Sequence, residues 1–460
     1  MTQMTVALDR RFVVKALAAA PLAASLPAMA TAQDSGADAI LLSISDLHSP
    51  YARLPALLQA VREIVASADA PVAMVINGDI FERGNVAATR SGASADWAFL
   101  ASLAAELPLV INLGNHETAI LDDMSVFVAR ATQLGAEVIG NLVDRRTGRF
   151  FAPVSTRIGL GGVTLAMMGV GTDNPFVYRQ PARETLSLLD PVGFAQDAFA
   201  DATGGADLPI LVSHAGVMAD RSILPGLDAG TLTLGAHDHL DFTHEEEGRT
   251  YLHGGAWARN LGVTRIRRSG DGLSLSHEMR ALPPSGGDEA LAAAIAAVKS
   301  EHLTDDDMAV ITERAAALDL ADSILLAAEA VRAASEADIA VLGHTTFGAP
   351  LAEGPLTRYD FDAFIRFDGA IAVAEVRGDV LAQIMTRANQ HLAGSLDQRT
   401  GDFIHAAAFD IDPARTYRLA TNGWTARNQD SYLGTSDLDF AEIDGLQLKA
   451  VVADALAAGL

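Results

Sequence analysis

Between residues 38 and 283, short apolar runs alternate with segments in which apolar residues recur at helical spacing. The runs at 40–44 and 72–76 have the length and composition of buried strands. The segments at 55–67 and 94–107 place an apolar face along a helix. Because strands that alternate with helices are typical of α/β proteins, we predict an α/β fold for this part of the chain.

The alternation stops at 283–287, where the sequence Pro-Pro-Ser-Gly-Gly predicts a turn. An alanine-rich helix with Asp288 as its cap is expected next, over 288–301. Further elements are expected beyond residue 305: helices at 321–334 and 379–390, and strands at 338–342, 370–376 and 416–420. A chain of 460 residues exceeds one typical core, so two domains are expected. We predict a first domain at 38–283, a linker helix at 284–304 and a C-terminal domain at 305–460.

Residues 1–32 have the layout of a secretory signal. Arg10 and Arg11 precede an apolar run at 16–26, and small residues that suit a cleavage site follow at 28–32. The paired arginines resemble the twin-arginine type of signal. The apolar run is too short to span a bilayer as a mature helix. We therefore predict export to the periplasm or beyond, with no membrane span in the mature chain; the alternative is a frayed amphipathic N-terminus.

Composition narrows the possible partners and ligands. The formal net charge of −25 argues against a nucleic-acid polymer or an anionic membrane as partner. An anionic substrate would need local positive charge, which bound cations can supply. The chain has no cysteine, so disulfides and thiolate ligands are excluded and any metal must bind nitrogen and oxygen.

Five apolar runs each end in residue types that bind metals. These residues are Asp46 and His48, Asp79, Asn115 in Gly114-Asn115-His116-Glu117, His214, and the pair His237 and His239. Because the carboxyl ends of strands in α/β sheets open at one edge, we expect these side chains to converge. A carboxylate has two oxygens and can bridge two cations, and Asp79 is our choice for that bridge.

A pair of cations ~3.5–4 Å apart can clamp a phosphoryl group and lower the pKa of a bound water. The nucleophile would then be a metal-bound hydroxide, and no serine or cysteine is needed. The nitrogen and oxygen ligands suit two divalent ions such as manganese, zinc, iron or cobalt. His116 is expected to be the catalytic residue, as general acid or as a positive partner for developing charge.

Each motif alone has an ordinary structural interpretation. Gly78-Asp79 is a common turn, and a lone histidine at a strand end is usually a hydrogen-bonded structural residue. The hypothesis therefore depends on all five motifs occurring in order, each after an apolar run. We expect structural roles for the other histidines: His244, His253, His277, His302, His344, His391 and His405.

The order DxH, GD, GNHE, SHAG and GxHDH resembles that of the calcineurin-like metallophosphoesterases, and more closely their 5′-nucleotidase branch. The segments at 349–362, 417–422 and 430–432 are similar to the C-terminal domain of that branch. The resemblance implies a four-layer α/β/β/α metallophosphatase sandwich followed by an α+β 5′-nucleotidase-like C-terminal domain. It also implies the metal sets: Asp46, His48, Asp79 and His239 for one ion, and Asp79, Asn115, His214 and His237 for the other. His116 and Asn115 would contact the phosphate.

The sequence departs from the family pattern at three positions. The family pairs its catalytic histidine with an aspartate three residues later, and Ala119 stands there; Asp122 or Asp123 could substitute if the loop bends back. A substrate-binding arginine is replaced by Gly348, and a second falls on Ala315 or Ala316, next to Arg314. Arg366 is a candidate for the lost positive charge. The two aromatic positions that stack a nucleobase are filled by Phe367 and Tyr432.

We therefore expect an exported two-metal phosphoesterase that hydrolyses a nucleotide or related phosphate monoester. One alternative is a phosphodiesterase or pyrophosphatase that acts on cyclic nucleotides or nucleotide sugars. Another is a non-catalytic extracytoplasmic protein that binds a ligand. The sequence does not predict the oligomeric state.

Overall fold

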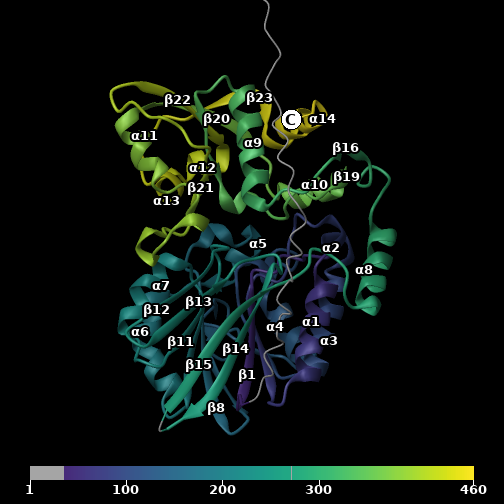
Figure 1. Ribbon diagram of the computed structural model, residues 1–460, viewed down its shortest axis with the longest axis vertical. Coiled ribbons are helices and arrows are strands. Elements are labelled where there is room, and N and C mark those ends of the chain that lie inside the picture. The colour runs from purple at the N-terminus through teal and green to yellow at the C-terminus, as the bar shows by residue number, and fades with distance from the viewer. Residues whose placement is uncertain (1–35, 271, 460) are drawn as a thin grey trace, which may run out of the picture. The chain divides into compact units, whose positions relative to one another are not determined.

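The computed structural model describes residues 36–270 and 272–459 (Figure 1). The predicted signal at 1–32 lies outside the described residues. Among the helices of the described part, none combines the length and the apolar character that crossing a membrane requires.

Two six-stranded sheets form the first part of the described chain. The strand order of the first sheet is β15-β14-β1-β2-β3-β4. Its strands are β1 (Ala39–Ser45), β2 (Val72–Asn77), β3 (Leu109–Asn112), β4 (Glu137–Ile139), β14 (Asn260–Ser269) and β15 (Gly272–Ala281). The order of the second sheet is β12-β13-β11-β10-β8-β7. Its strands are β7 (Ser155–Leu160), β8 (Val163–Gly171), β10 (Leu208–His214), β11 (Leu232–Gly235), β12 (Asp241–Glu246) and β13 (Arg249–Gly254).

The strands that carry the predicted ligands run parallel to their neighbours. β1, β2 and β3 pair in parallel, as do β8, β10 and β11. Ser45 of β1 lies opposite Asn77 of β2, which lies opposite Asn112 of β3. The loops that follow these three residues therefore leave the first sheet side by side at its carboxyl edge.

Alternate residues of each central strand pack on opposite faces of the sheet. In β1, Leu41 faces the second sheet, whereas Ile40 and Leu42 face helices. Figure 1 shows helices α1, α3 and α8 on one side of the stacked sheets and α6 and α7 on the other. These helices are α1 (Leu54–Ser67), α3 (Ser94–Glu106), α8 (Glu289–His302), α6 (Pro191–Thr203) and α7 (Val217–Ile223). Burial on both faces explains the nearly continuous apolar runs. The predicted four-layer α/β/β/α sandwich is confirmed.

Shorter elements complete this part. They are α2 (Val86–Ser91), α4 (Met124–Gln133), α5 (Gln180–Arg183), and the small sheet of β5 (Val143–Asp144), β6 (Arg149–Phe150) and β9 (Leu186–Ser187). The 3-10 turns η1 (His116–Thr118), η2 (Pro175–Val177) and η3 (Leu224–Gly226) lie in loops. Asp288 caps α8 as expected, because its side chain accepts a hydrogen bond from Leu291 N.

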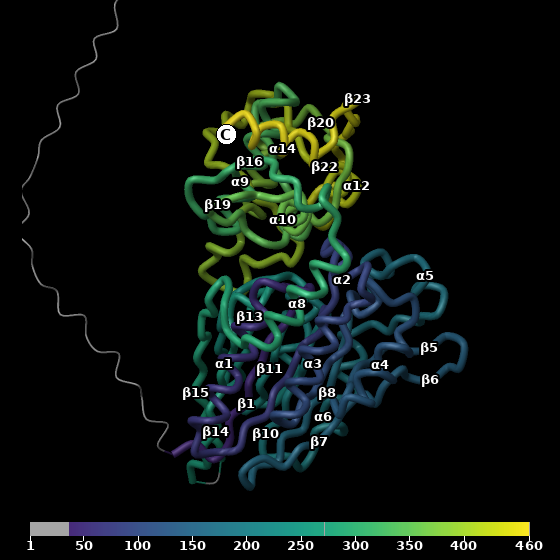
Figure 2. The backbone as a smooth tube through the Cα atoms, turned by 90° about the vertical axis from the view of Figure 1, so that its right-hand side faces the viewer, coloured from purple at the N-terminus to yellow at the C-terminus, as the bar shows by residue number. Residues whose placement is uncertain are grey.

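The second part, green to yellow in Figure 2, mixes helices with small sheets. Its four-stranded sheet has the order β17-β22-β20-β23. The strands of the whole second part, including those outside this sheet, are β16 (Val310–Arg314), β17 (Ile339–Ala340), β18 (Leu342–Gly343), β19 (Gly354–Thr357), β20 (Ala370–Arg377), β21 (Ile404–His405), β22 (Thr416–Asn422) and β23 (Ala441–Gln447). The helices are α9 (Leu320–Ala334), α10 (Arg358–Phe364), α11 (Gly378–Met385), α12 (Gly423–Arg427), α13 (Gln429–Leu433) and α14 (Leu448–Ala457), with 3-10 turns η4 (His344–Thr346), η5 (Gln390–Leu392) and η6 (Leu396–Gln398). The α+β second part is confirmed, and its predicted boundaries stay a prediction.

Candidate active site

Two buried asparagines join the sheets where the ligand-bearing strands end. Asn77 Nδ2 donates to the carbonyl oxygens of Ser213 and Leu234, at 2.8 Å each. Asn112 Nδ2 donates to Asn77 Oδ1 at 2.9 Å and to carbonyl oxygens of two strands of the other sheet at 3.0 Å. These polar groups would be costly to bury unpaired, so their hydrogen bonds fix the strand ends of both sheets against each other.

Five of the seven predicted ligand residues face one another in two overlapping groups. One group is Asp46, His48 and His239, and the other is Asp46, Asp79 and His214. His48 Nε2 lies 2.9 Å from His239 Nε2 and 3.8 Å from Asp79 Oδ2. Asp79 Oδ1 lies 3.2 Å from His214 Nε2. Asp79 thus presents one oxygen to each group, as a bridging carboxylate must.

The other two predicted ligands, Asn115 and His237, line the same cavity beside these groups. His237 Nδ1 lies 2.9 Å from Asp238 Oδ1, which orients its ring, and the ring centroid lies 5.7 Å from that of His214. A carboxylate behind a histidine is a common support for a metal ligand. Asn115 Oδ1 is buried and has no hydrogen-bond partner among the residues that the structure describes.

Five of the ligand residues have backbone in the left-handed region. The φ angles are 49° at Asp46, 55° at His48, 54° at Asp79, 80° at His237 and 58° at His239. Such values are uncommon outside glycine and are typical of functional sites, where the surrounding structure enforces them.

The donors of this site fit divalent cations. Burial raises the pKa of the Asp46 carboxyl to about 7. Burial alone would lower the pKa of His214, but the carboxylates of Asp79 and Asp46 raise it to about 10. Imidazole nitrogens and carboxylate oxygens that face one another in a buried space match ions such as manganese, iron, zinc or cobalt. Cations would satisfy these groups, so the residues present fit the metals that the sequence predicts.

Glu117 and Gly114 hold the loop of Asn115 and His116 close to Asp79. The Glu117 carboxylate accepts hydrogen bonds from Gly114 N (2.8 Å) and from Ile80 N (3.1 Å). A Cβ at Gly114 would lie only 2.6 Å from Asp79 N. The glycine of the GNHE motif is therefore required for this close approach of two backbones.

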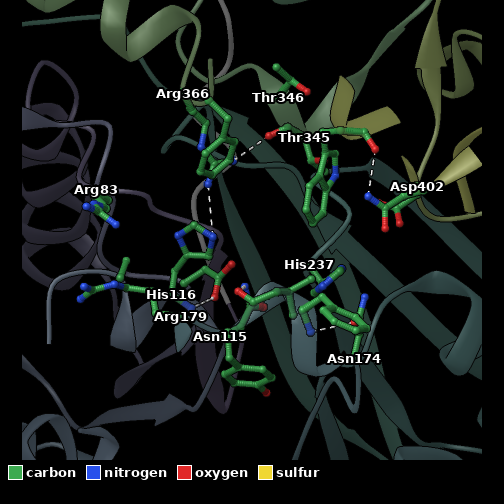
Figure 3. A pocket seen from close by; sticks show the side chains of 18 of the residues that line it. Arg83, Asn115, His116, Asn174, Arg179, His237, Thr345, Thr346, Arg366 and Asp402 are labelled. Atoms are coloured by element: carbon green, nitrogen blue, oxygen red, sulfur yellow. Dashed lines mark hydrogen bonds between the residues drawn. The ribbon is translucent and has the colours of Figure 1, made fainter. Parts of the chain in front are cut away.

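A cavity of about 420 Å³ opens over these residues. Its walls include side chains of both parts of the chain, and Figure 3 shows Arg366 directed from the second part towards His116. Five arginines line the cavity, namely Arg83, Arg179, Arg183, Arg366 and Arg427. In a chain with a net charge of −25, this concentration of cationic side chains favours an anionic ligand.

Comparison with protein families identifies both parts of the chain. Residues 41–240 match the calcineurin-like phosphoesterase family, and residues 303–435 match the 5′-nucleotidase C-terminal domain. Together the two matches cover well over half of the sequence. The chain is a calcineurin-like phosphoesterase of the 5′-nucleotidase type. It is thus a metal-dependent phosphoric ester hydrolase, which favours the predicted enzyme over a non-catalytic binding protein.

Solved structures share this fold at low sequence identity. A 5′-nucleotidase precursor from Thermus thermophilus is 17% identical, with a TM-score of 0.62 over 91% of this chain and 96% of that chain. The sulfate thiohydrolase SoxB from the same organism is 17% identical, with a TM-score of 0.63 over 92% and 94%. The 5′-nucleotidase from Candida albicans is 14% identical, with a TM-score of 0.58 over 93% and 99%. A comparison with curated protein sequences found no match.

The family pattern has an aspartate at the position of Ala119. In this phosphoesterase, no other aspartate among the described residues substitutes for it. Ala119 is buried in the apolar core. Asp122 pairs with Arg179 at 2.9 Å, and Asp123 caps α4. The loop therefore does not bend either carboxylate back towards His116.

Gly348, at the expected arginine position, has no room for a side chain. A Cβ there would lie 2.5 Å from the nearest atom of the Trp257 ring and 2.6 Å from Ala363 O. Arg314 donates to the carbonyl oxygen of Ala316 at 3.4 Å. Arg366 brings a positive charge from the second part of the chain to His116, with Nη2 3.4 Å from His116 Nε2.

The predicted stacking residues differ in exposure. Both line the cavity, but Phe367 is 44% exposed and Tyr432 only 3%. The Tyr432 hydroxyl hydrogen-bonds to Thr345 Oγ1 and accepts from Trp424 Nε1 at 3.3 Å. Trp424, which the sequence analysis did not single out, lines the cavity and is 38% exposed.

Glu82 is a further buried site residue that the sequence analysis missed. Its Oε2 lies 2.5 Å from Arg366 Nη2, 3.4 Å from His48 Nδ1 and 3.7 Å from His116 Nδ1. Burial alone would raise the pKa of Glu82, but Arg366 and His48 hold it well below its usual range. The only signal in the sequence is a carboxylate three residues after Asp79, next to apolar Ile80-Phe81.

Proposed function

We propose that this phosphoesterase is an exported, two-metal enzyme that hydrolyses a nucleotide or a related phosphate monoester. The observation that carries the proposal is Asp79, whose two oxygens face different groups of nitrogen and oxygen donors. One cation would be held by Asp46, His48, Asp79 and His239, and the other by Asp79, Asn115, His214 and His237. When bound, such a pair polarises the phosphoryl oxygens and lowers the pKa of a coordinated water.

His116 and Arg366 would act on the substrate itself. His116 Nε2 and Arg366 Nη2 lie 3.4 Å apart, so both can contact one phosphoryl group or its leaving oxygen. In that position His116 donates a proton to the leaving oxygen, and the Arg366 guanidinium stabilises the negative charge of the phosphoryl group.

The outer cavity suits a flat ring with anionic groups. Phe367 and Trp424 expose ring surface there. Base–aromatic stacking contributes ~1–3 kcal/mol per base in proteins that bind single strands, so one exposed ring would select nucleotides over simple phosphates. Arg83 and Arg179, beside His116 in Figure 3, add positive charge at the mouth.

A substrate panel tests the proposed reaction. We expect the purified protein to hydrolyse nucleoside 5′-monophosphates faster than cyclic nucleotides, nucleotide sugars or an aryl phosphodiester. Treatment with a chelator should abolish the activity, and added manganese or cobalt should restore it, because the nucleophile depends on bound cations. A clear preference for diesters or pyrophosphates would support the phosphodiesterase alternative. Full activity in protein shown by elemental analysis to be metal-free would contradict the proposal.

Export is inferred from the first 32 residues alone. The paired arginines and the apolar run predict that expression in the native host yields a periplasmic or secreted protein that lacks residues 1–32. Cell fractionation measures the compartment, and mass spectrometry of the N-terminus measures whether residues 1–32 have been removed. A full-length protein in the cytoplasm, when a known exported protein is processed in the same cells, would contradict export.

A further inference from the structure

One wall of the cavity carries more positive charge than the hydrolysis of a single phosphate requires. Arg83, Arg179 and Arg183 line the cavity from the first part of the chain. Figure 3 shows Arg83 and Arg179 on one side of His116, whereas Asp402 lies on the opposite side. The three side chains therefore form an arginine wall beside the reacting groups.

The guanidinium of Arg83 has no partner in the described part of the chain. Its side chain is exposed, and no hydrogen bond or ion pair engages it there. The backbone around it is nevertheless fixed: Thr89 Oγ1 donates to Arg83 O at 3.1 Å, and Gly84 N donates to Glu82 Oε1 at 2.7 Å. A fixed loop thus presents a free cation to the cavity.

Arg179 and Arg183 also keep donors or charge for a ligand. Arg179 Nη1 donates to Asp122 Oδ1 at 2.9 Å, but the Asp122 side chain is 70% exposed, so this pair is weak. A guanidinium has five N–H donors, and Arg179 uses one of them here. Arg183 donates to the carbonyl oxygens of Tyr178 and Phe176 at 2.7 and 3.2 Å. These carbonyls neutralise no charge, and their hydrogen bonds hold the loop that carries Arg179.

The carboxylates that line the cavity do not balance this wall. Asp79 faces the predicted metal ligands, and Glu82 Oε2 pairs with Arg366 Nη2 at 2.5 Å. Asp368 accepts hydrogen bonds from two backbone N–H groups of the second part, at 2.9 and 3.0 Å. Asp402 lies on the far side of the view in Figure 3. The arginine wall therefore has an excess of positive charge that suits an anionic group.

The exposed ring of Trp424 lies on the other side of the cavity. Trp424 Nε1 donates to Tyr432 Oη at 3.3 Å, and this hydroxyl hydrogen-bonds to Thr345 Oγ1. Figure 3 shows Thr345 on the side away from Arg83. A sugar whose reacting phosphate lies at His116 could therefore place its base against the ring and another substituent against the arginine wall.

We propose that Arg83, Arg179 and Arg183 form a second anion site, which binds a phosphate group carried by the leaving alcohol of the substrate. The preferred substrate is then a bisphosphate of a nucleoside or another sugar, of which one phosphate is hydrolysed and the other is held. Guanidinium groups suit this role because their N–H forks bind phosphate oxygens in pairs. The inference rests on the proposed function, because monoester hydrolysis beside His116 defines which phosphate reacts.

Steady-state kinetics tests the substrate class. Adenosine 3′,5′-bisphosphate should have a KM about tenfold or more below that of adenosine 5′-monophosphate, since a charged hydrogen bond is worth about one decade in affinity. Adenosine 3′-monophosphate should be its first product. Arg83→Gln should raise the KM for the bisphosphate about tenfold, and that for the monophosphate much less. Equal KM values in the wild type, or equal changes in the variant, would overturn the proposal. So would a preference for adenosine 5′-diphosphate over the bisphosphate.

Binding of the product tests the anion site without hydrolysis of the reacting phosphate. Adenosine 3′-monophosphate and adenosine differ only in the second phosphate, and calorimetry on the purified protein measures both. We expect tighter binding of the phosphate, weakened about tenfold by Arg83→Gln. Equal affinities, or rapid hydrolysis of adenosine 3′-monophosphate, would overturn the proposal. Arg83-dependent binding in a protein that hydrolyses none of these nucleotides would contradict the proposed function and leave the anion site standing.

Two further variants separate the arginine wall from general effects of charge. Asp122→Asn releases Arg179 from its exposed partner, so it should lower the KM for the bisphosphate about 1.5–5-fold; a higher KM would overturn the proposal. Arg157→Gln is the matched control, because Arg157 is an exposed arginine on β7 that donates to the carbonyl oxygens of Ala202 and Gly204. It should keep the wild-type KM for both substrates, and a tenfold rise for the bisphosphate there would overturn the assignment to this wall.

Discussion

Asp79→Asn is expected to reduce turnover by roughly 10³-fold or more, since two-metal clamps supply several kcal/mol of transition-state stabilisation and each 1.36 kcal/mol is tenfold in rate. The asparagine keeps an oxygen that can accept from His116 N, as Asp79 Oδ1 does at 2.7 Å, so the loop should keep its shape. It loses the charge and the second anionic oxygen that face His48 and His214. Steady-state kinetics and elemental analysis of the same preparation measure both effects.

Asp96→Asn is the matched control for this variant. Asp96 is equally buried, accepts a hydrogen bond from Tyr51 Oη at 2.8 Å and lies on α3, away from the cavity. We expect wild-type turnover and metal content in this control. Asp79→Asn with wild-type activity, or with both metals retained, would contradict a bridging role.

His116→Asn is expected to lower kcat on nucleoside monophosphates by about 10²–10⁴-fold, the usual contribution of a general acid. The effect on p-nitrophenyl phosphate should be much smaller, because that leaving group needs no proton. The dependence of kcat on leaving-group pKa across a series of phosphate esters measures the difference, and should be steeper in the variant.

Metal content separates this role from ligation. His116, His48 and Asp79 also lie close enough to form a third possible donor group. We expect His116→Asn to keep the wild-type metal content, as should the control His244→Asn, whose ring lies on β12 near Glu246. Loss of a metal in His116→Asn would show that His116 is a ligand and contradict its role as the acid.

The framework of the site was predictable because each ligand-type residue directly follows the apolar run of its own strand in the sequence. Parallel strands in a buried sheet read as apolar runs, and their carboxyl ends meet at one edge. The motifs at Asp46, Asp79 and Asn115 therefore led directly to the observed convergence. The cap at Asp288 was predictable for the same reason, because it depends on residues within one helical turn.

Features that depend on distant partners were not predictable. Glu82 becomes a buried site residue only because Arg366, far along the chain, neutralises it. In the sequence, Asn77 and Asn112 are only polar residues at the ends of apolar runs. Their role depends on carbonyl oxygens of the second sheet, to which both side-chain amides donate hydrogen bonds. Trp424 and Tyr432 are close in sequence, and the packing of α12 and α13 decides which ring is exposed.

Local periodicity also gave wrong element bounds in the second part. The strand expected at 338–342 is divided into β17 and β18, which pair with different strands. The helix expected over 379–390 ends at Met385. The chain then turns, and Asn389, with φ of 55°, donates its backbone N–H to Ile404 O at 2.7 Å. Asparagine tolerates this left-handed conformation, so apolar spacing alone extended the helix too far.

We propose that seven residues from separate strand ends hold a pair of cations around Asp79. Anomalous X-ray diffraction from crystals loaded with manganese tests it most directly. We expect two anomalous peaks about 3.5–4 Å apart, one on each side of the Asp79 carboxylate. We expect His48 and His239 to ligate the ion at one peak, and His214 and His237 to ligate the ion at the other. A single peak, or peaks away from these side chains, would contradict it.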